Sequence, residues 1–144
     1  MRRQGNASPG PASSPAMKRL ASGLVMAFAL CGAAKAGVAE EARDAYQRKD
    51  FATAMRHWQM LAGQGDATAQ TSLGHMYETG QGGRQDHAAA LQWYRKAADQ
   101  GHAPAQFSLA FMYQNGRGVA RDPAEAAKWM RMAAERDYGP AQDV

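Results

Sequence analysis

The sequence predicts an all-α fold, a solenoid of antiparallel helix pairs. The first observation is a repeat, because residues 65–100 aligned without a gap over residues 101–136 give 17 identities in 36 positions. A fixed period of this length is typical of stacked supersecondary units. The second observation is that apolar residues in each copy recur at the spacing of an α-helix. The length of 144 residues fits a single small domain.

The first predicted helix of the earlier copy covers residues 67–79. Its apolar residues fall at i, i+4, i+7 and i+8, namely Ala69, Leu73, Met76 and Tyr77. Gly80 follows and supplies the left-handed residue that ends a helix. The second predicted helix begins after Asp86, whose carboxylate can accept hydrogen bonds from exposed backbone N–H groups. Asp122 occupies the same position in the later copy, and Pro123 follows it, where a missing N–H does no harm.

The second helix of each copy is rich in alanine. Ala90, Trp93 and Ala97 form its stripe, and Gly101 follows its end. Small side chains allow two antiparallel helices to approach closely, and we expect Trp93 and Tyr77 to fill the gaps between neighbours.

The repeat pattern extends in both directions along the chain. Residues 51–63 match the second helix of the repeat, and residues 38–49 are predicted to pair with them through a shorter turn. Residues 137–144 begin a partial fourth unit. The expected repeat domain is therefore residues 37–144, with helix pairs at about 38–63, 67–100 and 103–136.

The start of the chain has the three parts of a secretory signal peptide. Lys18 and Arg19 form a basic start, an apolar run follows over residues 20–34, and small residues lead to Ala36. We expect translation to begin at Met17 and cleavage to follow Ala36, so that residues 1–36 form a leader.

The expected location follows from this leader. The apolar run of about 15 residues is shorter than the roughly 20 that a membrane-spanning helix needs. We therefore expect the cleaved chain to be periplasmic or secreted in a Gram-negative bacterium, without stable membrane insertion. The alternatives are an uncleaved anchor, a buried core helix and a lipoprotein modified at Cys31.

The distribution of charge argues against a nucleic-acid partner. The whole chain has a net charge of +4. Residues 1–36 hold five basic and no acidic side chains, which leaves 12 basic and 13 acidic residues in the remainder, a net charge of −1. A near-neutral domain lacks the basic surface that nucleic-acid binding needs. The same remainder contains no cysteine, so no disulfide is expected there.

The repeats resemble the Sel-1-like repeat family, a branch of the tetratricopeptide-type helical solenoids. The similarity rests on AxAQxSLGxMYExGxGxxxD followed by AxxxWYRKAADQG in residues 67–101, and on AxAQFSLAFMYQNGRGVARDPAEAAKWMRMAAE in residues 103–135. The resemblance implies a right-handed α/α solenoid. Some relatives are described as penicillin-binding or β-lactamase-like, and cysteine-rich members bridge each helix pair by a disulfide that this chain cannot form.

The residue inventory predicts no catalytic site, no cofactor and no metal site. After the leader the only serines are Ser72 and Ser108, which share one repeat position and lie in no serine-hydrolase motif. The histidines form no H-E-x-x-H pattern. His75 and Glu78 lie three residues apart and could share a metal ion, but a solvated polar pair is the simpler interpretation.

A partner-binding site is predicted where the two copies differ, because a solenoid presents an extended surface on its first helices. Thr71 and His75 of one copy are replaced by Phe107 and Phe111 in the next. The functional interpretation is an apolar anchor for a peptide or partner helix. The alternative is that both phenylalanines pack under a neighbouring helix or cover the C-terminal end. The predicted binding residues are Thr71, His75, Glu78, Phe107, Phe111 and Gln114.

The sequence thus predicts an exported scaffold module that binds a peptide or protein on its curved helical surface. The alternative functions are an envelope hydrolase or a peptidoglycan- or penicillin-interacting protein, or a truncated fragment of a longer array. Trp129, Met130 and Met132 are expected to lack a following repeat that covers them. Exposed apolar area of this kind would permit self-association through the uncapped C-terminal end.

Overall fold

The computed structural model describes residues 32–136, which form helices joined by short turns. The chain divides into two compact units, residues 1–36 and residues 37–144. Most of the expected signal peptide, including Met17, and the partial fourth unit lie outside the described residues. Among the helices of residues 32–136, none combines the length and the apolar character that spanning a bilayer requires.

The helices follow the predicted repeat. An opening helix is described over residues 32–47, two residues short of the predicted end, because Lys49 adopts a left-handed φ of 63° in the turn. The two predicted spans 51–63 and 67–79 are confirmed. The later helices are α2 (Phe51–Gly63), α3 (Ala67–Thr79), α4 (His87–Asp99), α5 (Ala103–Asn115) and α6 (Pro123–Glu135).

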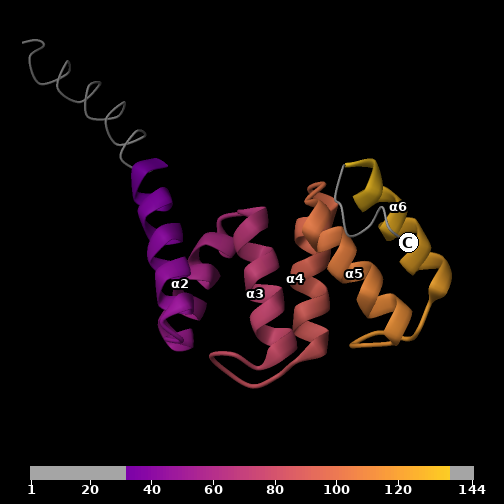
Figure 1. Cartoon of the computed structure of the whole chain (residues 1–144), viewed down its shortest axis with the longest axis horizontal. Coiled ribbons are helices and arrows are strands. Elements are labelled where there is room, and N and C mark those ends of the chain that lie inside the picture. Colours follow the sequence, from indigo (N-terminus) through magenta and orange to yellow (C-terminus); the bar gives the residue numbers. More distant parts are fainter. Residues whose placement is uncertain (1–31, 137–144) are drawn as a thin grey trace, which may run out of the picture. The chain divides into compact units, whose positions relative to one another are not determined.

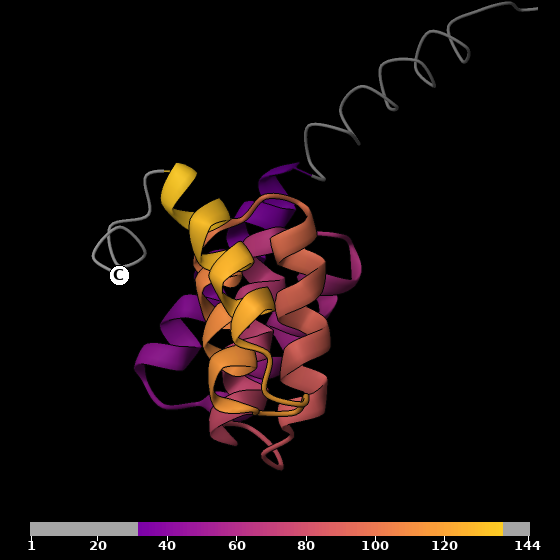
Figure 2. The same cartoon turned by 90° about the vertical axis from the view of Figure 1, so that its right-hand side faces the viewer.

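Each helix of the repeat unit packs against the next one along the chain. The pairs α3 with α4 and α5 with α6 make the most extensive contacts, and α2 with α3 and α4 with α5 join one pair to the following one. Figure 1 shows these helices side by side in chain order, and Figure 2 shows the same stack from the α6 end. The predicted solenoid of antiparallel helix pairs is therefore confirmed.

Aspartate caps begin four of the five helices from α2 onward. The predicted caps Asp86 and Asp122 are confirmed, since Asp86 accepts from the backbone N–H of Ala89 at 3.0 Å and Asp122 accepts from two N–H groups at 3.1 Å. Asp50 and Asp66 cap α2 and α3 in the same way. Such a cap stabilises a helix by about 1 kcal/mol, because it satisfies N–H groups that have no partner within the helix.

The interior contains one recurring polar side chain. Gln70 and Gln106 are buried at the same repeat position. The amide of Gln70 donates to the carbonyl of Ala62 at 3.2 Å, and that of Gln106 donates to the carbonyl of Ala98 at 3.1 Å. Each glutamine therefore satisfies a carbonyl at the end of the preceding second helix and ties one helix pair to the next.

In each of the two loops that join a first helix to its second helix, one glycine allows the loop to rest on the start of the preceding second helix. Gly118 has a φ of 68°, and a Cβ placed on it would lie 2.5 Å from the carbonyl oxygen of His87. Gly82 has a φ of 82°, and its Cβ would lie 2.7 Å from the carbonyl oxygen of Phe51. Both the backbone conformation and the close approach require glycine.

The expected exposure of the last helix is wrong for Trp129. This side chain is only 7% exposed, because it packs within the α5 and α6 pair in the same cluster as Ala110 and Tyr113. Met130 and Met132 are partly buried against that cluster. The side of α6 that carries Trp129 thus faces α5 of the same helix pair and not a following repeat.

Candidate functional site

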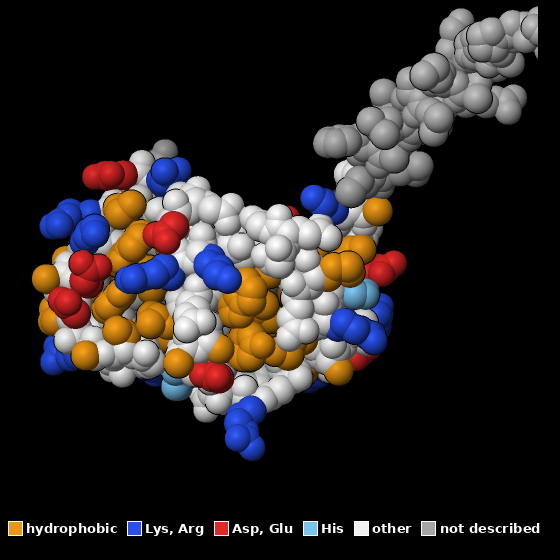
Figure 3. Space-filling model, turned by 180° about the vertical axis from the view of Figure 1, so that it is seen from behind, with side chains coloured by type: hydrophobic (Ala, Val, Ile, Leu, Met, Phe, Trp, Pro, Cys, Tyr) orange, Lys and Arg blue, Asp and Glu red, His pale blue; other side chains and the backbone are white. Residues whose placement is uncertain are grey.

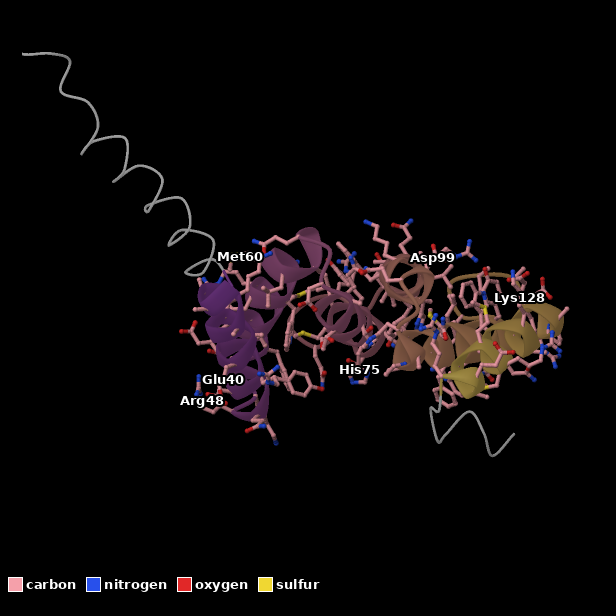
Figure 4. All side chains as sticks on the ribbon, turned by 90° about the horizontal axis from the view of Figure 1, so that it is seen from above. Glu40, Arg48, Met60, His75, Asp99 and Lys128 are labelled. Atoms are coloured by element: carbon pink, nitrogen blue, oxygen red, sulfur yellow. The ribbon has the colours of Figure 1, made fainter. Side chains whose placement is uncertain are left out.

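A groove crosses the first helices of the helix pairs. It has a volume of about 570 Å³ and draws its lining from the opening helix, α3 and α5, with single residues from α2 and α4 below them. Figure 4 shows His75 on this side of the ribbon and Met60 and Asp99 on the opposite side. The lining residues are Arg43, Tyr46, Gln47, Trp58, Thr68, Thr71, Ser72, His75, Tyr94, His102, Pro104 and Ser108.

The floor of the groove is aromatic and almost fully buried. Trp58 of α2 and Tyr94 of α4 are 4% and 1% exposed. The Tyr94 hydroxyl donates to Oε2 of Glu78 at 2.8 Å. Burial, aided by the Glu78 carboxylate, raises the pKa of Tyr94 well above its ordinary range, so its hydroxyl stays protonated and continues to donate.

Hydrogen bonds also fix the walls. The Tyr46 hydroxyl donates to Oε1 of Gln81 at 2.8 Å, and the Tyr46 ring packs edge-on against Phe51 with a centroid separation of 5.3 Å. The Thr71 hydroxyl donates to the carbonyl of Ala67 at 2.8 Å. With these hydroxyl protons used inside the protein, both tyrosines present rings to the groove, and Thr71 presents a methyl group and an acceptor oxygen.

The lining carries no acidic side chain. Arg43 is its one permanently charged residue, and two histidines, His75 and His102, join it. Burial lowers the pKa of His102, an effect that the nearby Asp66 carboxylate partly opposes. His102 is therefore neutral at pH 7.

The structure separates the predicted binding residues into two groups. Thr71 and His75 line the groove. Phe111 lies outside that lining and is 44% exposed, with the Arg117 guanidinium 5.3 Å from its ring centroid. Phe107 is half-buried, and Gln114 is exposed near the C-terminal end of the same helix.

Glu78 connects these two groups. Its Oε2 accepts from Tyr94 under the groove, and its Oε1 pairs with the Arg117 guanidinium at 3.4 Å. Arg117 is the same residue that lies over Phe111. Because both carboxylate oxygens are engaged, Glu78 positions Tyr94 and Arg117 and does not stand as a free polar contact.

Sequence reasoning missed much of the groove lining. Arg43 was not predicted because the turn after the opening helix is shorter than in the later copies, so the 36-residue spacing does not align that helix with α3 and α5. When Tyr46 is aligned on Tyr77 instead, Arg43 falls opposite Gly74. Trp58 and Tyr94 carry only the signal of a core stripe, which does not reveal that one edge of the core is the bottom of a groove.

Within residues 32–136 no group of three or more histidine, cysteine, aspartate or glutamate side chains is arranged to hold a metal ion, so the pair His75 and Glu78 forms no such site there. Ser72 and Ser108 line the groove. No histidine among the described residues hydrogen-bonds to either serine, the pairing that would activate a serine nucleophile.

The opposite face has a different character. Figure 3 shows hydrophobic areas there with charged side chains between them. On α4 the ammonium group of Lys96 lies 4.4 Å from the ring centroid of Trp93, and so covers part of that indole. Met60 on α2 is 47% exposed. This face therefore combines apolar side chains with charged ones beside them.

The stacked helix pairs, with a groove across their first helices, define an α/α helical-repeat protein. More particularly, the chain belongs to the Sel1 repeat family. The family model for the Sel1 repeat matches residues 33–66, 67–102 and 103–138, which together make up most of the sequence. A comparison with curated protein sequences gives no match.

Solved structures of Sel1-type proteins share this fold. A Sel1 repeat protein from Oxalobacter formigenes is 38% identical with a TM-score of 0.69 over 72% of this chain and 43% of its own. A protective antigen present in uropathogenic Escherichia coli strains is 37% identical with a TM-score of 0.61 over 62% of this chain and 19% of its own. Helicobacter pylori cysteine rich protein B is 21% identical with a TM-score of 0.60, over 62% of this chain and 68% of its own, and so supports the fold alone. The chain spans less than half the length of the first two proteins.

Proposed function

We propose that this protein is an interaction module that binds an extended segment of a partner protein in the groove across its first helices. Sel1 repeat proteins generally act as protein-interaction scaffolds. The observation that carries the proposal for this chain is the groove itself, which runs from the opening helix to α5 over an aromatic floor. The function is binding, without a chemical step.

The floor and the walls have separate tasks in this proposal. An apolar side chain of the partner lies over Trp58 and Tyr94 and against the partly exposed ring of Tyr46, whose burial contributes about 25 cal/mol per Å² of apolar area. Thr71 and His75 flank that side chain and contact the partner backbone. Since hydrogen bonds hold Tyr46 and Tyr94 in place before binding, little conformational freedom is lost when the partner docks.

A second contact area adjoins the groove in this proposal. Phe111 is an exposed aromatic side chain held against Arg117. Aromatic side chains at interfaces supply much of the binding energy. Phe111 serves as the outer anchor, with Phe107 and Gln114 beside it on the same helix, while Glu78 holds Arg117 in place.

Selection from a displayed library of random peptides tests the groove. The full-length chain is expected to enrich a peptide set, and Thr68→Trp, which places an indole in the groove, is expected to abolish that enrichment. Gln92→Trp adds the same side chain at an exposed position of α4 outside the groove lining and serves as the matched control. The proposal is contradicted if Thr68→Trp still enriches the same peptides as the unmodified chain. Circular dichroism confirms that both variants are folded.

We also propose that the protein is exported through the leader formed by residues 1–36. The basic start, the apolar run and the small residues before Gly37 support this. Expression in a Gram-negative host followed by fractionation and N-terminal sequencing is expected to find a periplasmic chain that begins at Gly37. A cytoplasmic chain with an intact N-terminus contradicts the proposal.

A further inference from the structure

The groove contains charge of one sign. Its ionisable lining side chains are Arg43, His75, His102 and two tyrosines whose hydroxyl protons are donated within the protein. No aspartate or glutamate lines it, although residues 37–144 carry more acidic than basic side chains. The basic character is thus a local property of the groove and not of the whole domain.

Arg43 is available for a ligand. It is exposed on the opening helix, and no acidic side chain of the described residues lies within ion-pair distance of it. By contrast, Arg117 is paired with Glu78 and Arg95 hydrogen-bonds to the hydroxyl of Tyr113. An unpaired guanidinium offers a planar fork of N–H donors that matches a carboxylate.

Further donors lie beside it. Gln47 carries an amide and Thr68 and Ser72 carry hydroxyls, and the side chains of all three line the groove without hydrogen bonds to other described residues. Donors of this kind suit the carbonyl oxygens of an extended chain, which have two lone pairs each.

The dimensions suit a short peptide. The lining comes from three first helices, the opening helix, α3 and α5, and the volume of about 570 Å³ is that of a site for a short segment of chain and not for a folded domain. A single arginine is a poor match for a phosphopeptide or a polyanion, since their recognition relies on clusters of basic residues.

From these observations we infer that the partner is an acidic peptide segment, whose carboxylate pairs with Arg43 and whose neighbouring apolar side chain lies over Trp58 and Tyr94. This inference rests on the proposed function and specifies its ligand. The carboxylate belongs to an aspartate or glutamate side chain within that segment. The Arg43 end of the groove fixes the register of the peptide, and the partly exposed walls at Tyr46 and Pro104 supply the remaining contact area.

A charge reversal tests the inference. The random-peptide selection is run on the full-length chain and on Arg43→Glu, with Arg131→Glu on α6 as the control, since Arg131 is exposed and outside the groove lining. The unmodified chain and Arg131→Glu are expected to enrich peptides that carry an acidic residue beside an apolar one. Arg43→Glu is expected to enrich peptides with lysine or arginine at that place instead. An unfolded variant cannot produce this exchange of preference.

Binding of one enriched peptide, made synthetically with a fluorescent label, completes the test. Arg43→Glu is expected to weaken its binding by about tenfold or more, whereas Arg131→Glu leaves it within about twofold. Two results would overturn the inference and leave the proposed function standing. One is that the enriched peptides depend on the groove but show no acidic preference, and the other is that they bind Arg43→Glu equally well. If the unmodified chain enriches no peptides, or if Thr68→Trp still enriches the same peptides, both the inference and the proposed function are overturned.

Discussion

The ring of Tyr94 packs directly on the Cα of Gly74, so closely that a Cβ on Gly74 would lie 2.8 Å from two ring carbons. In the next helix pair Ala110 takes the place of Gly74 and Met130 takes the place of Tyr94. Gly74, which has no side chain, thus leaves room for the large ring of Tyr94, and the small side chain of Ala110 leaves room for the flexible side chain of Met130. The same contact also sets the floor of the groove.

Gly74→Ala is expected to destabilise the fold by about 1–3 kcal/mol, since the extra methyl group forces the Tyr94 ring to move. Adding Tyr94→Met reproduces the combination found in the next pair and is expected to recover part of that loss. Urea denaturation of the two single variants and the double variant measures the coupling. Additive losses would show that the two positions do not interact.

Gly118→Ala is expected to cost about 2 kcal/mol or more, because the new Cβ meets the carbonyl oxygen of His87 and the backbone keeps a positive φ. Gly63→Ala is the control, since Gly63 has nothing within 4 Å of its Cβ position and lies in α2. That control is expected to be neutral or slightly stabilising. Thermal melting compares the two. Equal melting temperatures would mean that the loop does not rest on α4 as described.

The two buried glutamines are expected to differ in their contribution to stability. Gln70 donates to Ala62 and accepts from the Gln100 amide at 2.8 Å, whereas Oε1 of Gln106 has no partner among the described residues. Gln70→Met therefore loses two hydrogen bonds, and Gln106→Met loses one while removing an unsatisfied acceptor. We expect Gln70→Met to be the more destabilising by about 1 kcal/mol. Denaturant midpoints check the order, and a larger loss in Gln106→Met would contradict it.

Protonation of His102 is expected to make the fold less stable in mild acid. Its pKa in the folded state lies below the ordinary value of 6.5, so the unfolded chain binds this proton more readily. The free energy of unfolding therefore falls as the pH drops from about 7 through the folded pKa, and the loss is complete below it. His102→Asn is expected to flatten this dependence, and to stabilise the fold at pH 7 because asparagine can cap α5. Unfolding curves at pH 7 and pH 5 for both chains measure the difference. Parallel losses in the two would exclude His102 as the cause.

The helices could be predicted because the repeat supplies two copies of every signal. Asp86 and Asp122 begin equivalent helices, and Gly80 and Gly116 end equivalent ones in the left-handed conformation. The opening helix lacks that support, since its shorter turn uses Lys49 with a φ of 63° in place of a glycine.

The groove was only partly predictable. Thr71 and His75 can be identified because they differ between the two copies, and a single sequence shows that difference. Trp58 and Tyr94 look like ordinary core positions in the sequence, and only the packing of three helix pairs shows that they form a floor. The burial of Trp129 likewise depends on which side of α6 faces α5, a matter of tertiary packing that the apolar spacing leaves undetermined.

Chemical-shift mapping of the isotope-labelled full-length chain with an enriched peptide shows whether the peptide lies across the first helices. The amide signals of Gln47, Thr68, Ser72 and Ser108, which come from three different helices, are expected to shift together as the peptide is added. Shifts confined to α2, α4 and α6 would place the peptide on the opposite face and contradict binding in the groove.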